Sequence, residues 1–185
     1  MIDDTLADAK DRMTKAVEAL RKDLATIRTG RAHPGLVEHL RVDYYGAPTP
    51  LNQLATISVP EPRLLAVQPW DRQSLGAIEK AIHKADLGLN PINDGNIIRL
   101  VIPQLTEERR RELAKVVRKK VEEGRVAVRN VRRDCHDELR RLQREKEISE
   151  DAQFRAQDEL QKLTDGFIRE IEQVGEEKEA ELLAV

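Results

Sequence analysis

The stretch that decides the fold is residues 106–146, TEERRRELAKVVRKKVEEGRVAVRNVRRDCHDELRRLQREK. Apolar and small residues recur along it at intervals of three and four, the spacing that places side chains on one face of an α-helix. This apolar stripe consists of Leu113, Val117, Val121, Gly124, Val128, Val131, Cys135, Leu139 and Leu142. Thr106 suits the N-cap position, and Glu107 and Glu108 follow in the first turn, where acidic side chains interact favourably with the helix dipole. The stretch therefore predicts one long amphipathic helix.

Two further segments predict long helices of the same kind. Residues 1–29 carry an apolar stripe that ends before Thr29-Gly30. We expect this pair to stop the helix, because glycine readily adopts the left-handed conformation found at helix C-termini. The last segment begins at Ser149, a second candidate N-cap, and carries a third stripe. A helix with one apolar stripe needs partners to cover it in water, so these three helices predict a bundle.

Residues 31–105 have a different composition, since they contain all eight prolines and five of the nine glycines. Four short runs bounded by turn-forming residues predict β-strands: Leu40–Tyr45, Leu54–Val59, Leu64–Gln68 and Asn96–Ile102. Asn93-Asp94-Gly95 predicts a tight turn before the last run. One helix is expected from about Arg72 to Leu87, with Asp71 as its N-cap and Gly88 as its stop.

Together these segments predict an α+β fold, with a long three-helix bundle from residues 1–29 and 106–185 and an inserted β/α/β domain from residues 31–104. The chain would pass between the two domains twice, near residues 30–34 and near residues 103–106. Two short adjacent crossings predict a hinge about which the inserted domain could swing. The predicted hinge residues are Gly30, Arg31, Pro103, Gln104, Leu105 and Thr106.

The composition of the 185 residues excludes several classes of protein. Aromatic residues make up 3% of the chain and charged residues 36%, so a large base-stacking surface is excluded. No apolar run approaches the roughly 20 residues that span a bilayer. Met1-Ile2-Asp3-Asp4 lacks the basic start of a signal peptide, and the single cysteine, Cys135, fits a reducing compartment. We therefore expect a cytoplasmic protein that does not contact a membrane.

No cluster of reactive groups is visible in the sequence. The four histidines lack partners at metal-ligand spacing, and the chain has no Walker loop, no GxGxxG and no GxSxG motif. Cys135 lies on the apolar stripe, which favours a buried thiol over a nucleophile. Trp70, between a predicted strand and the predicted helix, is expected to pack against its neighbours. We therefore expect neither an enzyme nor a protein that needs a cofactor, a metal or a small-molecule substrate.

Charge is distributed unevenly along the chain, although the formal net charge is only -2. Residues 106–146 contain 15 basic and nine acidic residues, whereas residues 147–185 contain four basic and 12 acidic residues. The basic segment carries a row of arginines beside its apolar stripe: Arg118, Arg125, Arg129, Arg132 and Arg140. Arg133 widens this row, and Arg109, Arg110 and Arg111 form a second group near the predicted hinge.

Two interpretations of the arginine row remain open at this point. In the first, it is a solvated helix face with ion pairs to Glu122, Glu123 and Glu138. In the second, it contacts the phosphate backbone of a nucleic acid, for which the planar guanidinium is well suited. Residues 129–133 contain no acidic residue, which favours the second interpretation. With so few aromatic residues, recognition would depend on shape and phosphate rather than on base stacking.

A series of short motifs resembles the bacterial ribosome recycling factors. In chain order these motifs are Arg28-Thr29-Gly30-Arg31-Ala32, Tyr44-Tyr45-Gly46, Thr49-Pro50-Leu51, Pro69-Trp70-Asp71, Leu87-Gly88-Leu89-Asn90-Pro91, Asn93-Asp94-Gly95, Ile102-Pro103-Gln104-Leu105-Thr106-Glu107-Glu108-Arg109-Arg110 and Val128-Arg129-Asn130-Val131-Arg132-Arg133. They run in register from about residue 28 to residue 133, and the last helix fits the family in length and pattern. The resemblance thus covers essentially the whole chain.

The resemblance implies an L-shaped, non-enzymatic factor, which we expect to be a monomer. It would bind the post-termination ribosome and separate the subunits together with elongation factor G and GTP, releasing the mRNA. The bundle would lie on large-subunit ribosomal RNA, and elongation factor G would move the smaller domain. The resemblance implies RNA-binding roles for Arg132 above all, then for Arg129, Arg133, Arg125, Arg110, Arg28 and Arg31.

Two other classes of function remain as alternatives. The first is a coiled-coil adaptor whose charged helices bind other helices without RNA. The second is an RNA-modifying enzyme, which would need a cluster of reactive groups that the sequence does not show. Salt-sensitive binding to ribosomes would separate the recycling factor from the adaptor.

Overall fold

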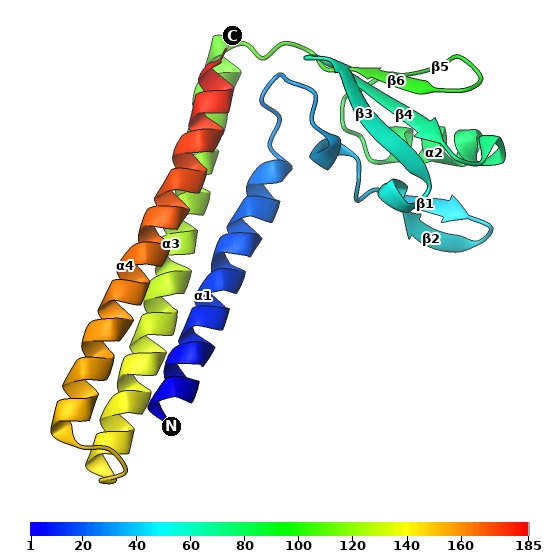
Figure 1. Cartoon of the computed structure of the whole chain (residues 1–185). Coiled ribbons are helices and arrows are strands. Elements are labelled where there is room, and N and C mark those ends of the chain that lie inside the picture. Colours follow the sequence, from blue (N-terminus) through cyan, green and yellow to red (C-terminus); the bar gives the residue numbers. More distant parts are fainter. Residues whose placement is uncertain (185) are drawn as a thin grey trace. The chain divides into compact units, whose positions relative to one another are not determined.

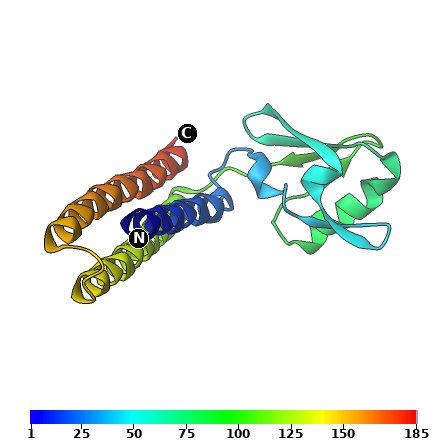
Figure 2. The same ribbon diagram turned by 60° about the horizontal axis from the view of Figure 1, so that its bottom comes forward.

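Three long helices form one of the two compact units of the structure, a computed structural model that describes residues 1–184. This unit contains Met1–Leu24 and the chain from Arg111 onward. Helices α1 (Ile2–Ala25), α3 (Glu107–Arg144) and α4 (Glu150–Leu183) run alongside one another in both views (Figures 1 and 2). The predicted three-helix bundle is therefore confirmed, as is the α+β class of the fold.

The apolar stripes of the three helices meet in the core of the bundle. All nine residues of the stripe predicted on α3 are buried. A Cβ atom added at Gly124 of α3 would lie 3.0 Å from Cδ1 of Ile171 on α4 and 3.6 Å from Cδ2 of Leu20 on α1. One added at Gly175 of α4 would lie only 2.5 Å from Cγ2 of Val121 on α3. The two glycines therefore allow α3 and α4 to pack closely.

The predicted N-caps of the two longer helices are confirmed. The Ser149 hydroxyl accepts a hydrogen bond from the Ala152 amide at 3.0 Å, and the Thr106 hydroxyl accepts one from the Arg109 amide at 3.1 Å. The end of α1 differs from the prediction, because the helix stops at Ala25 rather than at Thr29. The intervening residues include the β-branched Thr26, Ile27 and Thr29, which favour helices less, and Ile27 and Thr29 are buried.

The smaller unit, residues 25–110, is built from a sheet, a hairpin and a helix. Its antiparallel sheet has the order β3-β4-β6-β5, and β1 and β2 form a separate antiparallel pair. The strands are β1 (Arg41–Tyr44), β2 (Ala47–Pro50), β3 (Ala55–Glu61), β4 (Leu64–Pro69), β5 (Pro91–Asn93) and β6 (Ile98–Val101). The α-helix is α2 (Leu75–Lys84), and short 3-10 helices span Pro34–Leu36, Leu51–Gln53 and Arg72–Ser74.

Helix α2 supplies one side of the core of this unit. Ile78 and Ile82, one turn apart on α2, are fully buried in the same apolar cluster as Leu65 and Val67 of β4 and Leu100 of β6. Alternate residues of β4 point to this core, as expected of a strand with one face against a helix. The unit thus has its own core, separate from that of the bundle.

Two strands were missed by the sequence prediction, and both contain proline. β2 includes Pro48 and Pro50, and β5 begins with Pro91. Both are edge strands, where a residue without an amide N–H is tolerated because one side of the strand is unpaired. The turn predicted at Asn93-Asp94-Gly95 is confirmed between β5 and β6.

Two expectations about the smaller unit were wrong. Helix α2 ends at Lys84 rather than at Leu87, because Asp86 already adopts the left-handed conformation (φ 50°) two residues before Gly88. Trp70 does not pack as expected, since it is 66% exposed. Trp70 follows directly after β4, and its indole N–H donates a hydrogen bond to the Thr56 hydroxyl at 2.9 Å.

The segments predicted to form the hinge lie side by side within the smaller unit. Gly30 has a φ of +81°, and a Cβ atom added there would lie 3.6 Å from Cγ of Leu105. The Ala32 amide donates to the Pro62 carbonyl at 2.7 Å, and the Ile102 amide donates to the Arg63 carbonyl at 2.8 Å. Both segments are thus attached to the turn between β3 and β4. Hinge motion itself stays a prediction.

Candidate nucleic-acid interface

Helix α3 presents part of its arginine row to α4. Nε of Arg118 lies 2.9 Å from Oε1 of Glu179, and Nε of Arg125 lies 3.3 Å from Oε1 of Glu172. Arg118 and Arg125 are seven residues apart on α3, and their partners are seven residues apart on α4 in the opposite direction. The two helices are therefore antiparallel and in heptad register here. We call Arg118–Glu179 and Arg125–Glu172 the seam ion pairs.

Arg125 is the arginine of the row most fully engaged within the protein. Besides Glu172, it contacts Glu122, whose Oε2 lies 2.8 Å from its Nη1. The hydrogen bond that Arg125 donates to Glu122 is the main cause that raises the pKa of Arg125. The side chain is only 28% exposed. Of the arginines expected to bind RNA, Arg125 therefore has the least free hydrogen-bonding capacity.

Arg132 occupies the next heptad position on α3 but makes no ion pair with any of residues 1–184. Its Nη1 donates to Oε1 of Gln161 on α4 at 3.3 Å. Gln161 in turn donates through Nε2 to Oδ1 of Asp165 at 2.9 Å. The guanidinium of Arg132 thus keeps its charge uncompensated and most of its five N–H groups available.

Arg129 and Arg133 flank Arg132 and differ in their surroundings. Arg133 is exposed and makes no hydrogen bond or ion pair within the described part of the chain. Nη1 of Arg129 lies 3.6 Å from Oε1 of Glu122, and its side chain is 55% exposed. The absence of an acidic residue from residues 129–133 therefore does not isolate Arg129, because Glu122 reaches it from two turns away. Arg132 and Arg133, in contrast, form no ion pair with a carboxylate among residues 1–184.

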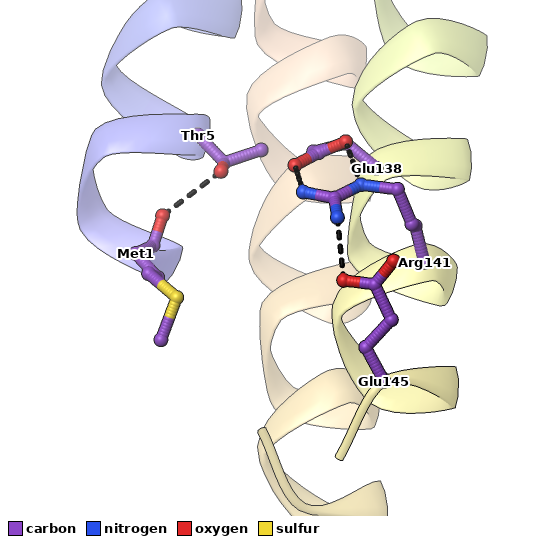
Figure 3. A network of polar contacts seen from close by, with 5 residues as sticks. All are labelled: Met1, Thr5, Glu138, Arg141 and Glu145. Carbon is purple, nitrogen blue, oxygen red and sulfur yellow. Dashed lines mark hydrogen bonds and ion pairs between the residues drawn. The ribbon is translucent and has the colours of Figure 1, made fainter. Parts of the chain in front are cut away.

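Arg141 is neutralised by acidic residues of its own helix, α3. Figure 3 shows Arg141 between Glu138 and Glu145, with nitrogen–oxygen distances of 2.6 Å to each carboxylate. Hydrogen bonding by Arg141 to the Glu138 carboxylate is the main cause that raises the pKa of Arg141. The basic segment is therefore not uniformly positive, since acidic neighbours decide which arginines can bind an external anion. Arg132 and Arg133 are adjacent arginines of α3 that make no ion pair among residues 1–184, and within the same residues Arg140 of the predicted row and Arg144 make none either.

The remaining arginines predicted to bind RNA belong to the smaller unit. Arg28 lies beside Gly88, where an added Cβ would come within 3.4 Å of its Nη1. Arg31 is exposed, whereas Nε of Arg110 is buried and has no hydrogen-bond partner among residues 1–184. These three arginines are thus held by a different unit from Arg132.

The thiol and the histidine rings show no arrangement for chemistry. Cys135 is 6% exposed, and burial raises the pKa of its thiol to about 11, so the expected buried, unreactive thiol is found. Nδ1 of His33 accepts a hydrogen bond from the Gly35 amide and caps a 3-10 helix. Among residues 1–184 no three His, Cys, Asp or Glu side chains are grouped as metal ligands. No helix in this range is long and apolar enough to cross a membrane.

Comparison with known proteins identifies the family of this chain, whereas the RNA-binding role of the arginine row stays a prediction. The family model of ribosome recycling factors matches residues 20–183. The chain belongs to the ribosome recycling factor family. The chain is 58% identical over all 185 residues to the ribosome-recycling factor of Carboxydothermus hydrogenoformans and 54% identical to that of Coxiella burnetii, with complete coverage of both proteins.

Solved structures agree with this assignment. A solution structure of a ribosome recycling factor is 47% identical, with a TM-score of 0.81 and coverage of 100% of this chain and 98% of the other. Models of the T. thermophilus ribosome recycling factor and the E. coli elongation factor G, bound to the E. coli post-termination complex, include a chain that is 50% identical, with a TM-score of 0.71 and full coverage of both chains.

The family gives the chain its class of function. Ribosome recycling factors are translation factors and not enzymes, as the motif series implied. The coiled-coil adaptor and the RNA-modifying enzyme find no support in these relatives. The sequence reasoning missed Gln161 and Asp165, since it treated α4 as an acidic face. Their signal was the seven-residue spacing of Asp165, Glu172 and Glu179, which matches the spacing of arginines on α3.

Proposed function

We propose that this protein binds the post-termination ribosome through large-subunit ribosomal RNA. With elongation factor G and GTP, it then promotes separation of the subunits and release of the mRNA. The observation that carries the proposal is the adjacent pair of half-buried Arg132 and exposed Arg133, neither of which has a compensating carboxylate among residues 1–184. Support also comes from a related recycling factor described together with elongation factor G on a post-termination complex.

The chemistry of this surface suits a phosphate backbone. A guanidinium donates two parallel hydrogen bonds to phosphate oxygens, and such charge-assisted bonds are about twice as strong as neutral ones. Arg129 can add to the surface if its contact with Glu122 at 3.6 Å opens. Arg125 requires a larger rearrangement, because Glu122 and Glu172 both hold it. We therefore rank Arg132 and Arg133 first, Arg129 next and Arg125 last.

The smaller unit would act as the moving part. Within this unit, both predicted hinge segments are attached to the turn between β3 and β4 by hydrogen bonds that the amides of Ala32 and Ile102 donate to its carbonyl groups. Rotation would then be taken up by residues 26–31 and 103–106, which include Gly30 with its positive φ. Elongation factor G would supply the force from GTP hydrolysis. Arg28, Arg31 and Arg110 would add RNA contacts next to this hinge.

We propose that the protein carries out this role in the cytoplasm as a monomer. A monomer is sufficient, because the bundle and the smaller unit each have a core of their own. Neither a cofactor nor a small-molecule substrate is needed, since the partner provides the nucleotide.

A subunit-splitting assay tests the proposal. Post-termination ribosomes are mixed with elongation factor G, GTP and the protein, and dissociation is followed by light scattering. We expect splitting with the natural chain and a large loss with Arg132→Ala. Arg118→Ala is the matched control, because Arg118 has the same heptad position but is paired with Glu179. Normal splitting and ribosome binding by Arg132→Ala would overturn the role given to Arg132.

A further inference from the structure

The two seam ion pairs set up a pattern that breaks at Arg132. Each step of seven residues along α3 is matched by a step of seven residues back along α4. One further step from Arg125 and Glu172 leads to Arg132 on α3 and Asp165 on α4. The register therefore places a third arginine opposite a third carboxylate. An Arg132–Asp165 ion pair is nonetheless not formed.

Gln161 takes the place of that ion pair. Its side-chain oxygen accepts from Nη1 of Arg132 at 3.3 Å, while its side-chain nitrogen donates to Oδ1 of Asp165 at 2.9 Å. Gln161 and Asp165 are one turn apart on α4, so a single amide can reach both groups. The amide thus satisfies the carboxylate and contacts the guanidinium at the same time.

Because the natural partner of Arg132 is the amide of Gln161 rather than a carboxylate, Arg132 remains able to bind an external anion. A carboxylate would neutralise the guanidinium and occupy two of its N–H groups, as at fork-to-fork ion pairs. The neutral amide accepts one weak hydrogen bond, because its donor–acceptor distance of 3.3 Å is longer than the usual range of about 2.7–3.2 Å. Arg132 is therefore oriented over the seam but keeps its charge, which is the state an arginine needs to bind phosphate.

We propose that Gln161 is a positioning residue for RNA binding. It orients the Arg132 guanidinium and, by engaging Asp165, prevents that carboxylate from neutralising it. This inference rests on the proposed function, in which Arg132 contacts ribosomal RNA. It adds a residue of the acidic helix α4 to the RNA-binding machinery.

The test replaces the amide by a carboxylate. Gln161→Glu gives Arg132 the kind of partner that Arg118 has in Glu179. The matched control is Gln173→Glu, which adds the same charge to α4 at a side chain that donates a hydrogen bond to Glu177 and, among residues 1–184, makes none with an arginine. Binding of each full-length variant to purified large ribosomal subunits is measured over a range of salt concentrations, and thermal unfolding is followed in parallel.

We expect Gln161→Glu to lower affinity roughly tenfold to a hundredfold, the scale of one charge-assisted hydrogen bond. The slope of log affinity against log salt should become shallower by about one, as for a lost phosphate contact. Gln173→Glu should change both quantities much less. In a protein that already carries Arg132→Ala, adding Gln161→Glu should reduce the affinity for large ribosomal subunits no further than adding Gln173→Glu does. The melting temperature should stay near that of the natural chain.

Three results would count against the inference, and they are distinguishable. If Arg132→Ala binds normally, the RNA-binding role proposed for Arg132 fails and the inference fails with it. If Arg132→Ala binds weakly but Gln161→Glu matches Gln173→Glu, only the positioning role of Gln161 is refuted. If Gln161→Glu weakens binding equally with and without Arg132, Gln161 acts by another route and the inference is again refuted.

Discussion

Close packing of α3 against α4 predicts opposite effects of alanine at two glycines of α4. A Cβ atom at Gly175 would lie 2.5 Å from Cγ2 of Val121, whereas one at Gly166 would meet nothing within 4 Å. Val121 is β-branched and buried, so it cannot rotate away easily. We therefore expect Gly166→Ala to stabilise the bundle and Gly175→Ala to destabilise it.

The magnitudes follow from two effects. Replacing glycine by alanine inside a helix gains about 1 kcal/mol of helix propensity. Forcing an extra methyl group into a packed core costs about 1–3 kcal/mol. Gly166→Ala has only the gain in helix propensity, whereas Gly175→Ala has both this gain and the cost of overpacking the core. The gain in helix propensity is common to both variants and cancels when their free energies of unfolding are subtracted. The remaining difference is the overpacking cost, about 1–3 kcal/mol.

Urea unfolding followed by circular dichroism at 222 nm measures this difference, because the long helices dominate that signal. The two variants should show similar denaturant dependence and separated midpoints, with Gly166→Ala the higher. Equal midpoints would refute the close approach at Gly175 and weaken the heptad register on which the arginine geometry rests.

Three further predictions concern single positions. Burial raises the pKa of the Cys135 thiol to about 11, so alkylation by iodoacetamide should reach half its maximal rate near pH 11. A midpoint near pH 9, the ordinary value for a thiol, would contradict this burial. Gly30→Ala should lower stability by roughly 1–2 kcal/mol because of the positive φ, whereas Gly76→Ala, in open space on α2, should not; thermal unfolding of both variants decides this. Ser149→Ala should cost about 1 kcal/mol in urea unfolding, since the Ala152 amide loses its cap; an unchanged midpoint would rule out this role.

The long helices could be predicted from sequence because their apolar stripes repeat over many turns. The stripe on α3 ran through Gly124 and Cys135 and proved buried at every position. The short strands β2 and β5 could not be predicted in the same way, since their prolines resemble loop residues and only the edge positions explain them. The end of α2 at Lys84 was likewise hidden, because Asp86, a non-glycine residue in the left-handed conformation, leaves little trace in sequence.

The candidate site was only partly visible from the sequence. The row of arginines on α3 could be read from its spacing, but not which of them are free. That distinction depends on carboxylates of α4, such as Glu172 opposite Arg125, and therefore on the register of two helices far apart in the chain. Gln161 could not be identified before that register was known, since an exposed glutamine on a helix is ordinarily unremarkable.

The central claim is that Arg132 contacts ribosomal phosphate while Arg118 does not. The most direct measurement is the salt dependence of binding to purified large ribosomal subunits, compared for the natural chain, Arg132→Ala and Arg118→Ala. Each phosphate contact contributes about one to the slope of log affinity against log salt. We predict a slope shallower by about one for Arg132→Ala and an unchanged slope for Arg118→Ala. A slope for Arg132→Ala equal to that of the natural chain would contradict the claim.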